Sequence, residues 1–150
     1  MDDMELNWYK KMAIDTFNAV WELMDKKDRT YEETLRMLHT AHASAFHWSF
    51  AGGAVNQARG EWQVSRAYCE AGMPDPALYH ASASLAIGET NSIGDFDLTF
   101  AYEAVSRALK LSGDDEESRR YLHLCRESAK EIGSEDDRNY LLSELGSIWE

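Results

Sequence analysis

Three of the chain's five histidines lie within ten residues, in the stretch HTAHASAFHW at positions 39–48. Imidazole binds metal ions and acts as a general base, so this stretch is the first place to look for chemistry. On an α-helix each residue advances about 100° around the axis and about 1.5 Å along it. His39 and His42 then share one face, one turn apart, whereas His47 lies about 12 Å from His39 along the axis and on another face. One metal ion with bonds of about 2 Å cannot bind all three on an intact helix.

Two of these histidines could still contribute to a metal site. His39 and His42 would chelate an ion if another helix supplied a third ligand, with His80 or Asp97 as candidates. The protein would then be a metal-dependent enzyme built on a helical bundle. However, the sequence contains no His-Glu-x-x-His pattern, and no acidic residue occurs at positions 34–60.

The interpretation that we prefer is a packing seam between helices. Small residues separate the histidines and would let a neighbouring helix approach closely: Ala41, Ala43, Ser44 and Ala45. Buried polar groups need hydrogen-bond partners, so we expect His42 and His47 to bond across the seam. Candidate partners on other segments are Asn56, Asp95 and Tyr102.

A stripe of arginine and tryptophan is the better candidate for a binding site. Arg59, Trp62 and Arg66 stand at i, i+3 and i+7, so two guanidinium groups flank an indole on one helix face. Asn56 extends this stripe by one turn, and Tyr102 of a later helix could line the same groove. Because arginine binds carboxylates and phosphates through two parallel hydrogen bonds, the stripe predicts a local site for an acidic group.

The alternative is that these arginines are used inside the protein. Three acidic residues further along the chain could pair with Arg59 or Arg66, namely Asp95, Asp97 and Glu103. Tyr102 would then only seal a helical hairpin. Glu103 and Arg107 also stand at i, i+4, a pair that contributes only a few tenths of a kcal/mol on an exposed surface. The spacing leaves both alternatives open.

Other catalytic motifs are incomplete. His80 and Ser84 lie one turn apart, but no acidic residue completes a local triad with them. The pair Gly52 and Gly53 has no phosphate-loop pattern around it, and the acidic runs at 114–117 and 135–137 lack the spacing of a calcium loop. We therefore expect no cofactor, and a binding protein rather than an enzyme.

Length and charge narrow the class of partner. A chain of 150 residues fits a single domain, 1–150. Its net charge of −12 repels phosphate backbones and anionic membranes, so we expect neither nucleic acid nor a membrane as a partner. No apolar run reaches the roughly 18 residues of a membrane-spanning helix, and the acidic start MDDMEL is unlike a signal peptide. We expect a cytoplasmic protein in which Cys69 and Cys125 are buried thiols and not a disulfide.

Capping residues and glycines divide the chain into seven predicted helices. The box TYEE at 30–33 starts one of them, and Asp75 followed by Pro76 starts another. The expected ranges are 4–24, 31–50, 54–71, 76–89, a fifth helix that is capped by Asp95 or Asp97 and ends at Gly113, a sixth that ends at Gly133, and a seventh that begins at 134–137 and reaches the C-terminus. No strand pattern occurs, so the predicted fold class is all-α.

Two of the predicted hairpins share a weak repeat. The string VSRA begins at Val64 and again at Val105, and the glycines that follow are Gly72 and Gly113, so both features recur after 41 residues. Stacked helix pairs of this length are typical of helical solenoids.

The first of these hairpins resembles a tetratricopeptide repeat, because small residues precede Tyr68 and are followed by Gly72 and Ala77. The second copy is more degenerate, with Leu109 and Ser118 in place of tyrosine and alanine. The string HASAFHW…NQARGEWQVSRAY…ALYHA…IGDFDLTFAYEA is also similar to an uncharacterised bacterial family of tetratricopeptide-like proteins, over most of the chain. The resemblance implies about seven antiparallel helices stacked as hairpins, in a right-handed solenoid with a C-terminal capping helix. It implies a small bacterial protein and no particular activity.

The favoured function is therefore a protein- or peptide-binding helical scaffold. Solenoids of this kind often hold acidic peptide ends in a concave groove, so the resemblance implies an inner groove that contains the Arg/Trp stripe. The first alternative is an enzyme or metal-binding bundle that uses His39 and His42. The second is a self-associating unit, such as a homodimer, anchored by tryptophans near the chain ends: Trp8, Trp21 and Trp149.

Overall fold

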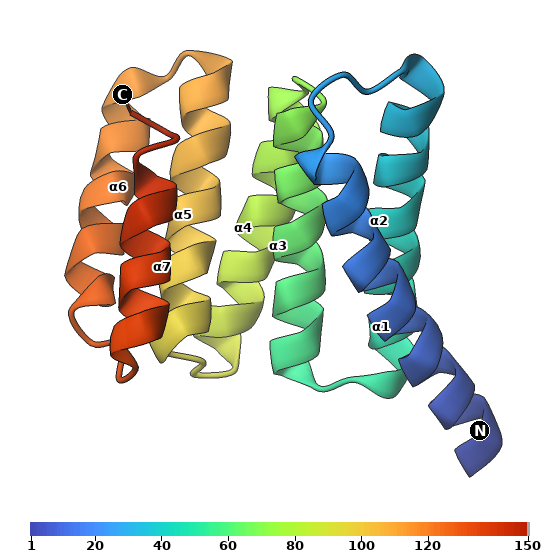
Figure 1. Cartoon of the computed structure of the whole chain (residues 1–150). Coiled ribbons are helices and arrows are strands. Elements are labelled where there is room, and N and C mark those ends of the chain that lie inside the picture. The colour runs from blue at the N-terminus through green and yellow to red at the C-terminus, as the bar shows by residue number, and fades with distance from the viewer. Residues whose placement is uncertain (150) are drawn as a thin grey trace.

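The computed structural model describes residues 1–149, and these form seven α-helices without a strand (Figure 1). The helices are α1 (Asp3–Asp25), α2 (Tyr31–Ala51), α3 (Ala54–Glu70), α4 (Pro74–Thr90), α5 (Asp95–Ser112), α6 (Asp115–Ala129) and α7 (Glu135–Leu145). The all-α prediction is confirmed.

Several predicted helix ends are also confirmed, for the expected reasons. At the start of α2 the Thr30 hydroxyl accepts a hydrogen bond from the Glu33 N–H, and the Glu33 carboxylate accepts one from the Thr30 N–H. These two bonds satisfy N–H groups that have no acceptor within the helix. Gly72 and Gly113 follow α3 and α5 with φ of +73° and +90°, a left-handed conformation that favours glycine.

The predicted start of α4 was wrong by two residues. Met73 is its N-cap and Pro74 its first residue, where Asp75 and Pro76 were expected. Both prolines fall in the first turn, where backbone N–H groups have no intrahelical acceptor, so neither breaks the helix.

The predicted cap of α5 was also wrong. Gly94 is the N-cap, and Asp95 is the first helical residue, with an unusual positive φ of +55°. The Asp95 carboxylate accepts hydrogen bonds from the backbone N–H of Phe96 and of Gly133, over 2.6 and 3.2 Å. Asp95 therefore joins the turn before α5 to the turn before α7. Asp97 takes no part in capping α5.

The last two helices are shorter than predicted. Helix α6 ends at Ala129 and not at Gly133, and α7 ends at Leu145 instead of reaching the C-terminus. Beyond both helix ends the backbone forms hydrogen bonds between residues three apart, as in a 3₁₀ turn. The Ile132 N–H donates to the Ala129 carbonyl, and the Ile148 N–H donates to the Leu145 carbonyl.

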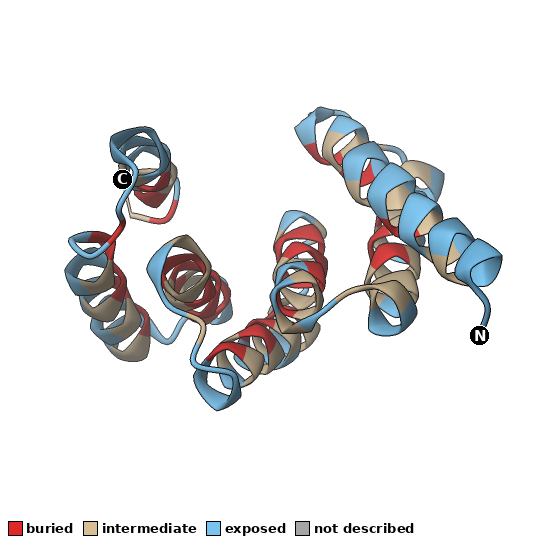
Figure 2. Cartoon of the chain, turned by 90° about the horizontal axis from the view of Figure 1, so that it is seen from below, coloured by how far each residue is buried: buried red, intermediate tan, exposed pale blue. Residues whose placement is uncertain are grey.

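The helices lie along an arc (Figure 2). Each helix from α1 to α5 packs against the next helix in the chain. In addition, α3 contacts α1 and α5, and α5 contacts α7. Seen from below, α1, α3, α5 and α7 lie on the inner side of the arc, and α2, α4 and α6 on the outer side (Figure 2).

The pairs α3–α4 and α5–α6 repeat the same hydrogen bonds. The Ser65 hydroxyl donates to the Ala77 carbonyl over 2.8 Å, and 41 residues later the Ser106 hydroxyl donates to the Ser118 carbonyl over 2.8 Å. A second set has the same spacing: Ser84 to the Ala58 carbonyl, and Cys125 to the Thr99 carbonyl. The weak sequence repeat therefore corresponds to a repeat of buried contacts.

The predicted packing seam along α2 is present. Ala41 and Ser44 are completely buried, and the Ser44 hydroxyl donates to the Ala13 carbonyl of α1. On the other side of α2, a Cβ atom at Gly60 of α3 would lie 3.2 Å from the Ala45 Cα atom. Small residues in α2 thus allow α1 and α3 to approach it closely.

Candidate functional site

The inner side of the arc holds a hollow of about 460 Å³. Its walls come from α1, α3, α5 and α7, with one residue from α4. Six aromatic rings line it: Phe17, Trp21, Trp62, Phe96, Phe100 and Tyr140. The charged residues of its lining are Arg59, Asp97 and Asp137. Volumes of this order, with mostly apolar walls and a few polar groups, are typical of ligand sites.

A second hollow of about 400 Å³ adjoins the first, because Trp21 and Tyr140 line both. Its remaining lining is Met24, Asp25, Arg66, Glu70 and Glu144. We call the two hollows together the inner groove. The groove therefore contains all three residues of the predicted Arg/Trp stripe.

Arg59 lies at the wall of the groove and is paired at the same time. Its Nε donates to Asp97 Oδ1 over 2.7 Å, and its Nη2 donates to Asp97 Oδ2 over 3.1 Å. This two-point contact with Asp97 raises the pKa of the Arg59 guanidinium. The Arg59 side chain is still 49% exposed, and the Asp97 side chain 16%.

Arg66 is nearly buried, and two carboxylates surround it. Its Nη2 lies 3.5 Å from Glu144 Oε2, and its Nη1 lies 3.9 Å from Glu103 Oε1. Burial by itself would lower the pKa of Arg66, but Glu103 and Glu144 outweigh it and raise the pKa. Both arginines of the stripe thus line the groove, and both have internal carboxylate partners, as the second alternative from the sequence expected.

Glu103 is the centre of a buried charge cluster. Its side chain is 0% exposed and lies between Arg66 and Arg107, whose Nε donates to Glu103 Oε1 over 2.7 Å. The pair of Glu103 and Arg107 is therefore mostly buried, so the few tenths of a kcal/mol that hold for an exposed pair do not apply to it. Arg107 further donates to Ser147 and to the Glu144 carbonyl.

The remaining predicted site residues are Trp62, which lines the first hollow, and Asn56 and Tyr102, which line neither of the two hollows. Trp62 is packed between Trp21 and Phe100, with ring centroids 5.6 and 5.5 Å away. Asn56 accepts from the Gly53 N–H at the start of its own helix, and it also lines a smaller hollow of about 120 Å³ that shares Phe17 and Arg59 with the first hollow. Tyr102 lies beside Tyr121 and does not line the groove, which agrees with the hairpin-sealing alternative.

The histidines form a separate network away from the groove. His42 Nε2 lies 2.8 Å from the Tyr68 hydroxyl, and its ring is 5.2 Å from that of His80. His80 Nδ1 lies 2.6 Å from Glu61 Oε2, and its ring stacks on Tyr68. Burial and the neighbouring His80 lower the pKa of His42.

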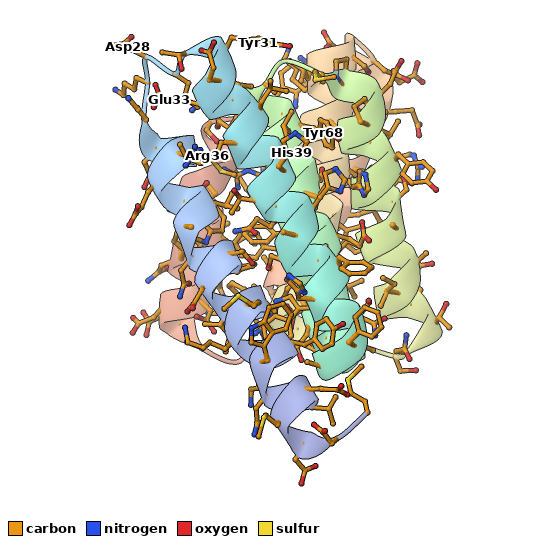
Figure 3. All side chains as sticks on the ribbon, turned by 90° about the vertical axis from the view of Figure 1, so that its right-hand side faces the viewer. Asp28, Tyr31, Glu33, Arg36, His39 and Tyr68 are labelled. Atoms are coloured by element: carbon orange, nitrogen blue, oxygen red, sulfur yellow. The ribbon has the colours of Figure 1, made fainter. Side chains whose placement is uncertain are left out.

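The expected partners of the histidines were wrong. His42 bonds to Tyr68, and His47 packs edge-on against Trp8 with its Nδ1 unpartnered in the described chain. His39 is exposed on α2, on the side of the molecule where Figure 3 also labels Tyr68. Over residues 1–149 the structure contains no group of three or more histidine, cysteine, aspartate or glutamate side chains placed to hold a metal ion.

An acidic partner for His80 does exist, although no local spacing indicated one. Glu61 supplies it from the neighbouring helix α3. Ser84 does not complete a triad with them, because its buried hydroxyl donates to the Ala58 carbonyl.

Sequence reasoning missed the groove residues of α1 and α7. Tyr140 and Trp21 line both hollows. Asp137 adds a carboxylate to the first hollow, and Asp25 adds one to the second. Asp137 and Tyr140 stand at i, i+3 on α7, so their shared face was visible in the sequence. That this face lines the same hollows as α1 depends on the packing of all the helices between them, which periodicity does not encode.

Comparison with known protein families, characterised proteins and solved structures finds no match to this chain. None of the described helices is long and apolar enough to cross a membrane.

Proposed function

We propose that the protein is a tetratricopeptide-like scaffold whose inner groove binds a segment of a partner protein or a peptide. In this proposal the antiparallel hairpins stack into a right-handed solenoid, and α7 caps its C-terminal end. The protein would work in the cytoplasm, where the free thiols Cys69 and Cys125 would stay reduced.

The repeated contacts support the solenoid part of the proposal. Hydrogen bonds of the same kind recur after 41 residues between α3–α4 and α5–α6, and both first helices end at a left-handed glycine. Stacked repeats of one supersecondary unit form extended concave surfaces, and such surfaces are where solenoids bind their partners.

The single observation that carries the binding proposal is the aromatic groove. Six rings line one hollow, and Tyr140 is 49% exposed although it is a large side chain. Exposed aromatic side chains in a concave site are typical anchors for a partner. The groove also reaches across four helices, which favours an elongated ligand over a compact one.

A peptide selection tests the proposal. A library of short random peptides is selected on the immobilised wild-type protein and on two variants, Tyr140→Ala in the groove and Tyr31→Ala outside it. Tyr31 is a matched control, because it is 75% exposed at the start of α2 and lines neither hollow. We expect peptides that are enriched on wild type and Tyr31→Ala and lost on Tyr140→Ala, with circular dichroism unchanged in both variants. Equal enrichment on all three proteins would contradict binding in the groove.

A second candidate function is self-association through the N-terminal end. The first turns of α1 project beyond the other helices (Figure 1). There exposed aromatic side chains from the first half of α1 and the end of α2 gather around His47: Trp8, Phe46 and Phe50. Of the three tryptophans named from the sequence, Trp21 lines the groove and Trp149 lies under Lys110 and Arg119, so Trp8 is the one that remains available.

Light scattering over a dilution series tests this candidate. A homodimer that uses these aromatic side chains should dissociate when Phe46→Glu places a charge among them. A wild-type protein that is monomeric at all concentrations would exclude the candidate.

A further inference from the structure

The inner groove is acidic even though it contains the two arginines of the stripe. Five carboxylates line its two hollows, from Asp25, Glu70, Asp97, Asp137 and Glu144. Three of them are already paired, Asp97 with Arg59, Glu144 with Arg66, and Glu70 with Arg29. Within residues 1–149, Asp25 and Asp137 enter no ion pair. Each hollow therefore contains one carboxylate without an ion pair, although Asp137 is near enough to Arg59 to help raise the pKa of that guanidinium.

Asp25 is in a position that its own helix disfavours. It is the last residue of α1, and no basic residue lies in that last turn. The carboxyl end of a helix carries a partial negative charge, so an aspartate there is repelled by the backbone of its own helix. Arg29 supplies a cation at this helix end, where its Nη1 donates to the carbonyls of Leu23, Met24 and Lys26, but its ion pair is with Glu70 and not with Asp25. The Asp25 carboxylate therefore stays exposed at the groove without an ion pair.

The guanidinium groups do not offset this charge for an incoming anion. Arg59 is already bound at two points by Asp97, and Arg66 is nearly buried between Glu103 and Glu144. An acidic ligand would have to displace one of these carboxylates and would also approach Asp25 or Asp137. A cationic ligand would not have to displace a carboxylate, and Asp25 and Asp137 would attract it.

We propose that the ligand of the inner groove is a peptide segment with two basic side chains that flank an apolar one. One basic side chain pairs with Asp137 and the other with Asp25, and the apolar side chain packs on Trp21 and Tyr140, which both hollows share. The aromatic walls favour the same chemistry, because lysine and arginine cations are attracted to the faces of tryptophan and tyrosine rings. This inference rests on the proposed function and specifies its ligand.

The composition of the selected peptides tests the inference separately from the function. Peptides that are lost on Tyr140→Ala and carry lysine or arginine on both sides of a leucine, phenylalanine or other apolar residue would support it. Tyr140-dependent peptides rich in aspartate or glutamate, or without charge, would keep the binding function and overturn the basic ligand. If no peptide depends on Tyr140, the function and the inference fail together.

Removal of the two charges provides the second readout. A selected basic peptide is labelled, and its Kd is measured by fluorescence anisotropy for wild type, for Asp25→Asn with Asp137→Asn, and for Asp28→Asn with Asp136→Asn. The control pair removes the same charge from exposed positions close by, which line neither hollow. We expect the groove pair to weaken binding about tenfold and to reduce its dependence on salt, with little change for the control pair. Equal effects of the two pairs would show that only the overall charge of −12 attracts the peptide, and would overturn the assignment.

Discussion

Arg59 and Asp97 form a two-point ion pair between α3 and α5, with Nε–Oδ1 and Nη2–Oδ2 distances of 2.7 and 3.1 Å. The pair lies in the wall of the groove and joins two helices that are separated in sequence by α4. It therefore links α3 to α5 and neutralises the Arg59 guanidinium in the groove wall. Arg66, about two turns further along α3, is instead neutralised in a buried position between Glu103 and Glu144.

We predict that the two arginines differ in their contribution to stability. Arg59→Ala should lower the free energy of unfolding by about 1 kcal/mol at most. About half of the Arg59 side chain is exposed, so water screens its attraction to Asp97. Arg66→Ala should lower it by about 3 kcal/mol, because it leaves the carboxylate of Glu103 buried with one cation fewer. Urea unfolding followed by tryptophan fluorescence measures both values. Equal losses for the two variants would contradict this ranking.

We predict a comparable loss when the buried carboxylate itself is removed. Glu103→Ala leaves Arg66 and Arg107 close together without the charge between them, and should cost about 3 kcal/mol or more. Glu103→Gln keeps the shape and one acceptor oxygen, so it should cost less than Glu103→Ala. A control on an exposed pair is Glu117→Ala, since Glu117 contacts Arg120 at the surface of α6. If Glu103→Ala is as stable as wild type, the Glu103 carboxylate is not needed to offset the charges of Arg66 and Arg107.

The sequence predicted the helices well because their signals are local. The capping box at Thr30 and the glycines at 72 and 113 act within one turn of the chain, and the structure has them as expected. The stripe of Arg59, Trp62 and Arg66 was likewise correct as a face of one helix. The errors at α4 and α5 arose because the observed caps, Met73 and Gly94, make no side-chain capping bond, so the nearby aspartates were the stronger local signal.

Long-range contacts were the part that the sequence did not supply. The choice of Asp97 over Asp95 as the partner of Arg59 depends on Asp95 being held by the Gly133 N–H, a contact across the α6–α7 turn. The partner of His80 is Glu61 on another helix, and the groove carboxylates come from α1 and α7. Each of these pairings requires the packing of the whole arc, whereas the 41-residue repeat describes only its middle.

We predict that both thiols react slowly in the folded protein. Burial raises the pKa of Cys69 to about 11 and that of Cys125 to about 12, so at neutral pH almost no thiolate is present in either case. Labelling with iodoacetamide near pH 8, followed by mass spectrometry, should be slow for the native protein and rapid at both positions in urea. Cys125 is completely buried and should be the slower of the two. A thiol that is labelled in the native state as fast as in urea would contradict the assigned burial.

We predict that His42 makes the protein sensitive to mild acid. Its pKa in the folded state is lowered by burial and by His80, although Glu61 acts in the opposite direction. Between this lowered value and the ordinary value of about 6.5, the unfolded chain binds more protons than the folded one, so stability rises with pH in this window. Stability is therefore lost as the pH falls through the ordinary histidine range. His42→Gln removes the titrating group and keeps a polar side chain opposite the Tyr68 hydroxyl. Urea unfolding of wild type and His42→Gln at pH values on both sides of this window should show a smaller loss for the variant, whereas parallel losses would assign the acid sensitivity to other groups.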